Sequence, residues 1–144
     1  MKERFNMQEV QPQAFKAMFA LEAYLAGTTL NTIHKELIKI RASQINGCAY
    51  CLNMHTRDAL KHGETAQRIF VLDAWREAGL FTEEEKAVLA VTEEVTLIQK
   101  GLSDDTYHKA EQMLGKEYLA QVIMAVVTIN AWNRIAISTH KALD

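Results

Sequence analysis

The sequence predicts an all-α fold, a single-domain bundle of about six or seven helices over residues 1–144, and three observations support this prediction. Apolar residues recur at i, i+3 and i+4, the spacing that gives a helix one apolar face. The 6 glycines fall between these periodic segments, where they can adopt the left-handed conformation that ends a helix. No segment alternates apolar and polar residues between turn signals, as the strands of a hairpin do.

The first two predicted helices span residues 13–26 and 29–45. The first follows the single proline, Pro12, and stops at Gly27, and the second stops just before Gly47. Proline suits the start of a helix and glycine the position after its end. The apolar positions are Phe15, Met18, Phe19, Leu21, Tyr24 and Leu25 in the first helix and Leu30, Ile33, Leu37 and Ile40 in the second.

The next two predicted helices span residues 49–62 and 64–78, and Gly63 and Gly79 follow them. In both segments the apolar residues recur at the helical period. These residues are Leu52, Ala59 and Leu60 in the earlier helix and Ile69, Leu72 and Trp75 in the later one.

The last three predicted helices are marked by start signals or by length. Thr82 and Glu85 form a capping box before an apolar run, and Ser103 caps the next helix. The final helix, residues 116–142, is apolar over more than one stripe. Such a helix lies at the centre of a core or at a subunit interface. We expect both roles for it, and hence a homo-oligomer.

Composition and charge indicate a soluble globular domain without nucleic-acid or membrane partners. Hydrophobic residues make up 49%, charged residues 24%, and the net charge is -2. No cluster of basic and aromatic residues suits a phosphate backbone. The longest apolar run, residues 122–129, is far shorter than the roughly 20 residues that span a bilayer. The N-terminus lacks the apolar region of a signal peptide, so we expect a cytoplasmic protein.

The two cysteines stand close together, in the run Cys48-Ala49-Tyr50-Cys51. A secreted domain held by disulfides would spread more cysteines along its chain. Gly47 permits a sharp turn, so Cys48 is expected at or near a helix N-terminus with Cys51 one turn further on. At this spacing the two sulfurs can close a short disulfide.

A histidine follows at the spacing that catalysis needs. His55 is four residues after Cys51, so both side chains share one helix face. The nucleophile is a thiolate, which the positive end of a helix favours. His55 can accept the Cys51 proton and stabilise the thiolate, and Cys48 can resolve an oxidised Cys51 into a disulfide. The pattern predicts thiol redox chemistry.

Glu36 completes the candidate site from the preceding helix, where it lies on the apolar face. A carboxylate in that position is largely buried and needs a partner. We expect this partner to be His55, directly or through a water, and a buried Glu36 could then pass a proton to or from the thiols. An ion pair with Arg41 or Arg134 is the structural alternative.

These residues belong to segments that resemble a known family. The segments are Glu36 itself, RASQINGCAYCLNMHTRDA (41–59), Gly63-Glu64-Thr65, AWREAGLFTEEEKAVL (74–89) and INAWNRIAIST (129–139). They resemble the AhpD-like alkylhydroperoxidases within the carboxymuconolactone decarboxylase superfamily. The resemblance implies an all-α fold, a homo-oligomer (a trimer or hexamer), and peroxidase or disulfide-reductase chemistry at the cysteine pair.

Roles follow from the resemblance position by position. Cys51 is similar to the peroxidatic cysteine that becomes a sulfenic acid, and Cys48 to its proton donor and resolving partner. Glu36 and His55 are similar to the proton relay. The implied substrate is a hydroperoxide, and an external thiol, dithiol or protein reductant takes the place of a bound cofactor. Tyr50 departs from members that serve a peroxiredoxin, which carry histidine there.

Three alternatives stay open at this point. The cluster could form a redox-responsive or zinc-binding module without turnover, although structural zinc usually has more sulfur ligands. It could reduce disulfides of a protein partner. A lyase of the wider superfamily is disfavoured, because the decarboxylase branch lacks the cysteine pair. The remaining histidines are predicted to be surface residues or helix caps: His34, His62, His108 and His140.

Overall fold

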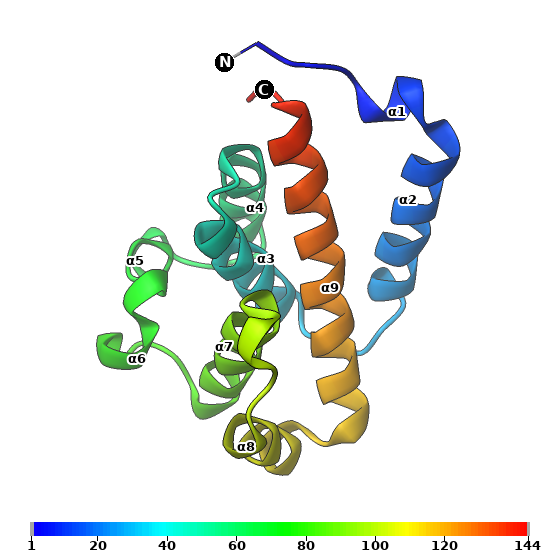
Figure 1. The fold of residues 1–144 in the computed structure, drawn as a ribbon. Helices are drawn as coiled ribbons and strands as arrows, with labels where there is room; N and C mark the ends of the chain where they lie inside the picture. Colours follow the sequence, from blue (N-terminus) through cyan, green and yellow to red (C-terminus); the bar gives the residue numbers. More distant parts are fainter. Residues whose placement is uncertain (1, 144) are drawn as a thin grey trace.

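A central helix, α9 (Lys116–Thr139), organises the structure, and five other helices pack against it (Figure 1). The structure is a computed structural model that describes residues 2–143. Within that range it contains nine α-helices, two short 3₁₀ helices and no strand, which confirms the predicted all-α bundle. The other α-helices are α1 (Met7–Val10), α2 (Pro12–Ala26), α3 (Thr32–Asn46), α4 (Ala49–Lys61), α5 (Ala66–Phe70), α6 (Trp75–Ala78), α7 (Glu83–Thr96) and α8 (Asp104–Leu114), and the 3₁₀ helices are Leu72–Ala74 and Ile98–Lys100.

The burial of α9 explains its apolar composition. Helices α2, α3, α4, α7 and α8 all contact it, so it meets protein on several sides. By length and composition this helix could cross a membrane, since its most apolar window has a mean hydropathy of 1.3. Half of that window is buried inside the bundle, against the helices that contact α9.

Helix boundaries follow the capping signals. Thr82 and Glu85 form the predicted capping box of α7, and the Ser103 hydroxyl accepts from the Thr106 N–H at the start of α8. Helix α3 begins only at Thr32, because the side chain of Asn31 caps it. Helix α9 stops at Thr139, short of the predicted 142, because His140 adopts a left-handed conformation (φ 54°).

The predicted helix over residues 64–78 is wrong as a continuous element. The chain instead forms α5, a 3₁₀ turn and α6. Its buried residues, Ile69, Leu72 and Trp75, recur every three positions, which matches the 3₁₀ period better than the 3.6 of an α-helix. Helix α1 was not predicted, since a single turn capped by Asn6 is too short to show periodicity.

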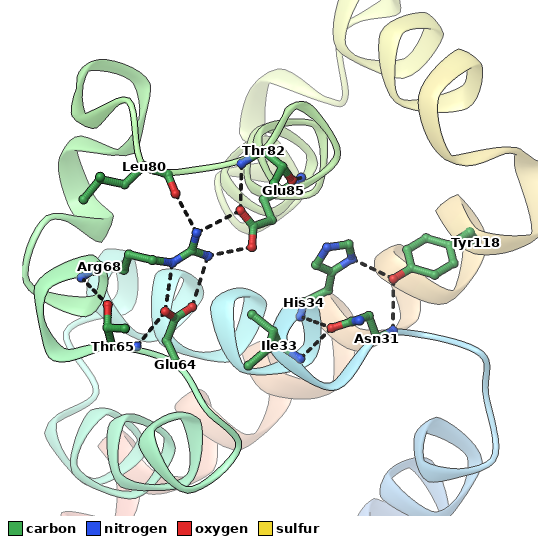
Figure 2. A network of polar contacts seen from close by, with 10 residues as sticks. All are labelled: Asn31, Ile33, His34, Glu64, Thr65, Arg68, Leu80, Thr82, Glu85 and Tyr118. Atoms are coloured by element: carbon green, nitrogen blue, oxygen red, sulfur yellow. Dashed lines mark hydrogen bonds and ion pairs between the residues drawn. The ribbon is translucent and has the colours of Figure 1, made fainter.

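A charged network joins the α5 region to α7 (Figure 2). The Arg68 guanidinium binds Glu64 at 2.8 Å and Glu85 at 2.6 Å, and it also donates to the Leu80 carbonyl at 2.6 Å. Burial acts to raise the pKa of Glu85, but hydrogen bonds from Arg68 and the Thr82 backbone lower it below its ordinary value. The network therefore holds a loop-rich segment against the core by ionised contacts.

His34 is buried, which corrects its predicted surface position. Its Nδ1 and the Tyr118 hydroxyl share a hydrogen bond of 2.6 Å (Figure 2). The Tyr118 oxygen also accepts the Asn31 N–H at 3.0 Å, so the phenolic proton is free to go to His34. Burial lowers the pKa of His34 and favours the neutral ring. The pair ties the start of α3 to the start of α9.

Candidate active site

A tight turn between α3 and α4 presents the cysteine pair. Gly47 ends α3 in the left-handed conformation (φ 70°), and the Cys48 N–H donates back to the Ser43 carbonyl at 3.0 Å. Cys48 is then the N-cap of α4, as expected from the sequence, and its Sγ accepts the Cys51 N–H at 3.4 Å. The Cys48 sulfur therefore lies at the positive end of a helix, where negative charge is favoured.

The two cysteines are joined in a disulfide, and their Cα atoms are 5.4 Å apart. Both are almost fully buried, with exposed fractions of 1% for Cys48 and 2% for Cys51. They belong to the larger of the two apolar clusters, which also includes residues of α3, α7 and α9. The predicted closeness of the two sulfurs is thus confirmed.

Glu36 and His55 form a buried pair next to the cysteines. His55 Nδ1 lies 3.2 Å from Glu36 Oε2, and both side chains are more than nine-tenths buried. The two atoms are close enough for an ion pair, but within residues 2–143 neither forms an aligned hydrogen bond. A buried carboxylate and imidazole at this distance can exchange a proton after a small rotation.

The alternative ion pairs of Glu36 are not formed. Arg41 binds Glu93 at 2.8 Å, on the side of α3 that meets α7. Arg134 donates to the carbonyl and side-chain oxygens of Asn130 on its own helix. Glu36 therefore has His55 as its ion-pair partner, which is the pairing expected from the sequence.

A cavity of about 430 Å³ opens onto this group. Cys51 and His55 line it, whereas Cys48 and Glu36 are not part of its wall. The size suits a small organic ligand. The arrangement gives one sulfur and one imidazole access to such a ligand and keeps the second sulfur and the carboxylate within the protein.

The walls of the cavity come from elements far apart in the sequence. Phe15 and Phe19 of α2 face Trp132 of α9, and residues of the segment before α2 close another side. That segment is fixed to the end of α9, since the Arg4 N–H donates to the Thr139 carbonyl at 2.9 Å. This wall was not predicted, because a tryptophan such as Trp132 in an apolar helix is equally typical of a core or an interface residue.

A network of buried amides lies behind the turn that carries Cys48. Asn46 Nδ2 donates to the side-chain oxygens of Asn130 and Asn133 at 2.9 and 2.8 Å. Asn133 Nδ2 in turn donates to the Ser43 hydroxyl at 3.0 Å. The network fixes the end of α3 against α9 and was missed by sequence reasoning. Its only signal was a pair of asparagines three residues apart in an apolar helix.

The zinc-binding alternative requires several ligand side chains close together. Within residues 2–143, no group of three or more histidine, cysteine, aspartate or glutamate side chains lies close enough together to hold a metal ion. Structural zinc usually has four ligands, with more sulfur than this site offers. The zinc-binding alternative therefore gains no support from the positions of these side chains.

Comparisons with known proteins agree with this architecture. The profile of the carboxymuconolactone decarboxylase family matches residues 12–94. The uncharacterized protein YdfG of Bacillus subtilis (strain 168) is 42% identical over 139 residues, which cover 96% of this chain and 95% of YdfG. The crystal structure of ATU0492 from Agrobacterium tumefaciens, a protein of unknown function and candidate antioxidant defence protein AhpD, has a TM-score of 0.96 at 37% identity over 99% of each chain. A peroxidase-related protein from Silicibacter sp. TM1040 shares the fold, with a TM-score of 0.81 at 18% identity over 96% of this chain and 81% of that one.

Proposed function

The chain belongs to the carboxymuconolactone decarboxylase family, and from that premise we propose that it is a thiol-dependent hydroperoxide reductase that uses the Cys48–Cys51 pair. The observation that carries the proposal is the position of Cys51 and His55 on the wall of one cavity, with Cys48 bonded to Cys51. A nucleophile, a base and a resolving thiol in a ligand-sized cavity are the parts that two-electron peroxide reduction requires.

The proposed cycle starts from both thiols in the reduced state. His55 accepts the Cys51 proton, the thiolate attacks the terminal oxygen of the hydroperoxide, and the O–O bond breaks. Cys51 becomes a sulfenic acid, and the leaving alkoxide takes the proton from His55 and departs as an alcohol. The Cys48 sulfur then attacks the sulfenic sulfur, and hydroxide leaves with the Cys48 proton as water. Two thiols are thereby oxidised to the disulfide for each hydroperoxide reduced.

Glu36 and the helix N-terminus assist this cycle. Glu36 stabilises the imidazolium of His55 while that ring holds the Cys51 proton. Cys48, at the N-cap of α4, is in the position where a thiolate is stabilised for attack on Cys51. An external thiol, dithiol or protein reductant then restores both thiols, and it reaches the pair from the cavity side, where Cys51 lies.

The proposal is tested by the consumption of cumene hydroperoxide with dithiothreitol as the reductant. We expect turnover by the native protein, and a rate reduced to the uncatalysed background in Cys51→Ser. Cys48→Ser, mixed with the hydroperoxide after dithiothreitol has been removed, should form a sulfenic acid that accumulates, because no neighbouring thiol resolves it. Turnover that survives in Cys51→Ser would contradict the proposed nucleophile. A reaction of lactones or keto acids that survives the loss of both cysteines would support a lyase instead.

Reduction of a partner's disulfide is the second candidate function, since the same thiol pair could carry it. Because both sulfurs are buried, a protein disulfide, like a protein reductant, would have to reach Cys51 through the cavity. Oxidation of the reduced protein by a protein disulfide, faster than by any hydroperoxide, would favour this second candidate.

We also propose that the protein is a homo-oligomer, a trimer or hexamer, in the cytoplasm. Phe70, Leu97 and Ile98 are apolar and largely exposed in the single chain, with Phe70 at 79%. Side chains of this size are commonly covered by another subunit. Sedimentation equilibrium would test the assembly, and a monomer at micromolar concentration would contradict it.

A further inference from the structure

We propose that Phe15, Phe19 and Trp132 form a specificity wall that selects an uncharged hydroperoxide with a bulky, apolar body, such as an aromatic ring. The inference rests on the proposed function, because it concerns the substrate of the same site. It assigns a role to three residues outside the Cys48, Cys51, His55 and Glu36 group.

The wall is a preformed aromatic surface. The ring centroid of Phe15 lies 5.2 Å from that of Phe19 and 5.2 Å from that of Trp132. The ring centroids of Phe19 and Trp132 are 5.7 Å apart. All three pairs are edge-to-face, a favourable arrangement for aromatic rings. The Trp132 Nε1–H donates to Glu22 at 3.0 Å, which fixes the orientation of the indole. A wall fixed in this way needs little ordering when a ligand binds.

Part of this surface lacks a protein partner. Phe19 is 55% exposed although it lines the cavity beside two other rings. Covering an exposed aromatic side chain with an apolar ligand is favourable in proportion to the area removed from water. A hydroperoxide with a hydrocarbon body would cover Phe19, whereas hydrogen peroxide has no apolar surface with which to do so.

The charges of the cavity wall are neutralised within the protein. Glu22 pairs with Lys39 at 3.4 Å, and Asp58 pairs with Lys61 at 3.0 Å. Glu3 lies 3.9 Å from the ammonium of Lys141. In the part of the chain that the structure describes, each carboxylate of the wall thus has a lysine partner, and each lysine of the wall a carboxylate.

This pairing sets the charge of the ligand. An anionic ligand would lose its hydration in the cavity and would have to displace the carboxylate partner of Lys39 or Lys141 to gain a cationic one. An uncharged ligand loses nothing comparable. The cavity of about 430 Å³ has room for a ring-bearing molecule whose O–O group points to Cys51 on the same wall.

The test measures binding, so that it does not depend on thiol chemistry. The probe is 2-phenyl-2-propanol, the alcohol that cumene hydroperoxide would yield, titrated calorimetrically into the native disulfide form. Phenylacetate serves as the ionised probe. We expect saturable binding of the alcohol and at least about tenfold weaker binding of phenylacetate, because the ionised probe is desolvated without a partner.

Variants then locate the binding surface. Phe19→Ala should weaken binding of the alcohol about fivefold, since part of the covered aromatic area is lost. Tyr24→Ala is the matched control, because Tyr24 is an exposed aromatic residue of the same helix outside the cavity wall. The Tyr24→Ala variant should bind the alcohol with the same affinity as the native protein. Trp132→Phe provides a second test that keeps an aromatic ring but removes the hydrogen bond to Glu22, and it should weaken binding by a smaller factor.

Three outcomes would overturn the inference: no saturable binding of the alcohol, equal binding of phenylacetate, or equal effects of Phe19→Ala and Tyr24→Ala. None of them concerns the thiols. If the alcohol binds as expected but no hydroperoxide oxidises Cys51, the proposed function fails while the assigned binding surface stands. If hydroperoxides oxidise Cys51 but substitutions in the specificity wall do not change the affinity for the alcohol, only the specificity inference fails.

Discussion

His55 Nδ1 and Glu36 Oε2 lie 3.2 Å apart in a buried pair, and only the histidine reaches the cavity that Cys51 also lines. The carboxylate comes from α3 and the imidazole from α4, so the pair depends on the turn that joins the two helices. This relationship makes His55 the group through which the carboxylate can act on the thiol.

Replacing Glu36 tests that relationship. Glu36→Gln keeps the shape of the side chain but removes its charge, so His55 loses the partner that stabilises its protonated form. We expect the rate of Cys51 oxidation by cumene hydroperoxide to fall about 10- to 100-fold, less than the roughly 10²- to 10⁴-fold contributed by direct proton transfer, because Glu36 acts only through His55. The measurement is stopped-flow oxidation of the reduced protein over a range of pH. Glu83→Gln, at an exposed site, is the control, and equal rates in the two variants would remove Glu36 from the mechanism.

Acid should weaken the contact between α5 and α7. The pKa of Glu85 is lower in the folded protein than its ordinary value of about 4.5. The pairing of Glu85 with Arg68 therefore contributes its full stabilisation at pH values above that ordinary pKa. The contribution is lost as the pH falls through the lowered pKa of the folded state. Glu85→Gln should therefore reduce the free energy of unfolding by about 2 kcal/mol at pH 7.

The pH dependence of that difference provides the check. Glutamine can still serve in the capping box, so the variant removes chiefly the charge. Urea denaturation of both proteins at pH 7 and below pH 4 should show the difference between them shrinking in acid. A difference that stays constant over this range would mean that packing, and not ionisation, is responsible.

The buried amide network should be sensitive to the loss of one member. Asn133→Leu is nearly isosteric but leaves the Ser43 hydroxyl without its partner, and it removes one of the two hydrogen bonds of the Asn46 amide, whose bond to Asn130 remains. We expect the free energy of unfolding to fall by about 2–3 kcal/mol, because unpaired buried polar groups are costly. Urea denaturation measures this loss. Val127→Leu, at an exposed site of the same helix, should leave the stability nearly unchanged.

At Gly47, in the turn before the cysteine pair, there is room for a larger side chain, but the left-handed backbone is unfavourable for residues other than glycine. A methyl group at this position would have no atom within 4 Å, so the only cost of Gly47→Ala is its left-handed backbone. That cost is about 1 kcal/mol. Asparagine adopts this conformation more readily, so Gly47→Asn should be more stable than Gly47→Ala. The reverse order in thermal denaturation would show that side-chain crowding dominates.

Much of the fold was predictable because its signals are local. Capping residues such as Ser103 and glycines such as Gly47 mark helix ends through contacts within a few residues. The prediction of one helix over residues 64–78 was wrong because the buried residues of this segment follow a three-residue period, which resembles an α-helical period over a short stretch. Helix α1 was not predicted because a single helical turn is too short to show a period.

The candidate site was predictable in part for a related reason. Cys48, Cys51 and His55 lie within two turns of one helix, where spacing alone fixes which side chains meet. The pairing of Glu36 with His55 needed one further step, that a carboxylate on an apolar face must have a partner. The contacts of Phe15 and Phe19 with Trp132 and the His34–Tyr118 hydrogen bond join residues 84 or more positions apart, and no spacing rule relates them.

The most direct test of the thiol mechanism is a single turnover. The protein is reduced, freed of reductant without oxygen, and mixed with one equivalent of cumene hydroperoxide, and free thiols and intact mass are followed together. The mechanism predicts the rapid loss of two thiols and about two mass units, with no such loss in Cys51→Ser. Thiols that stay intact, or that react no faster than free cysteine, would contradict peroxide reduction at this site.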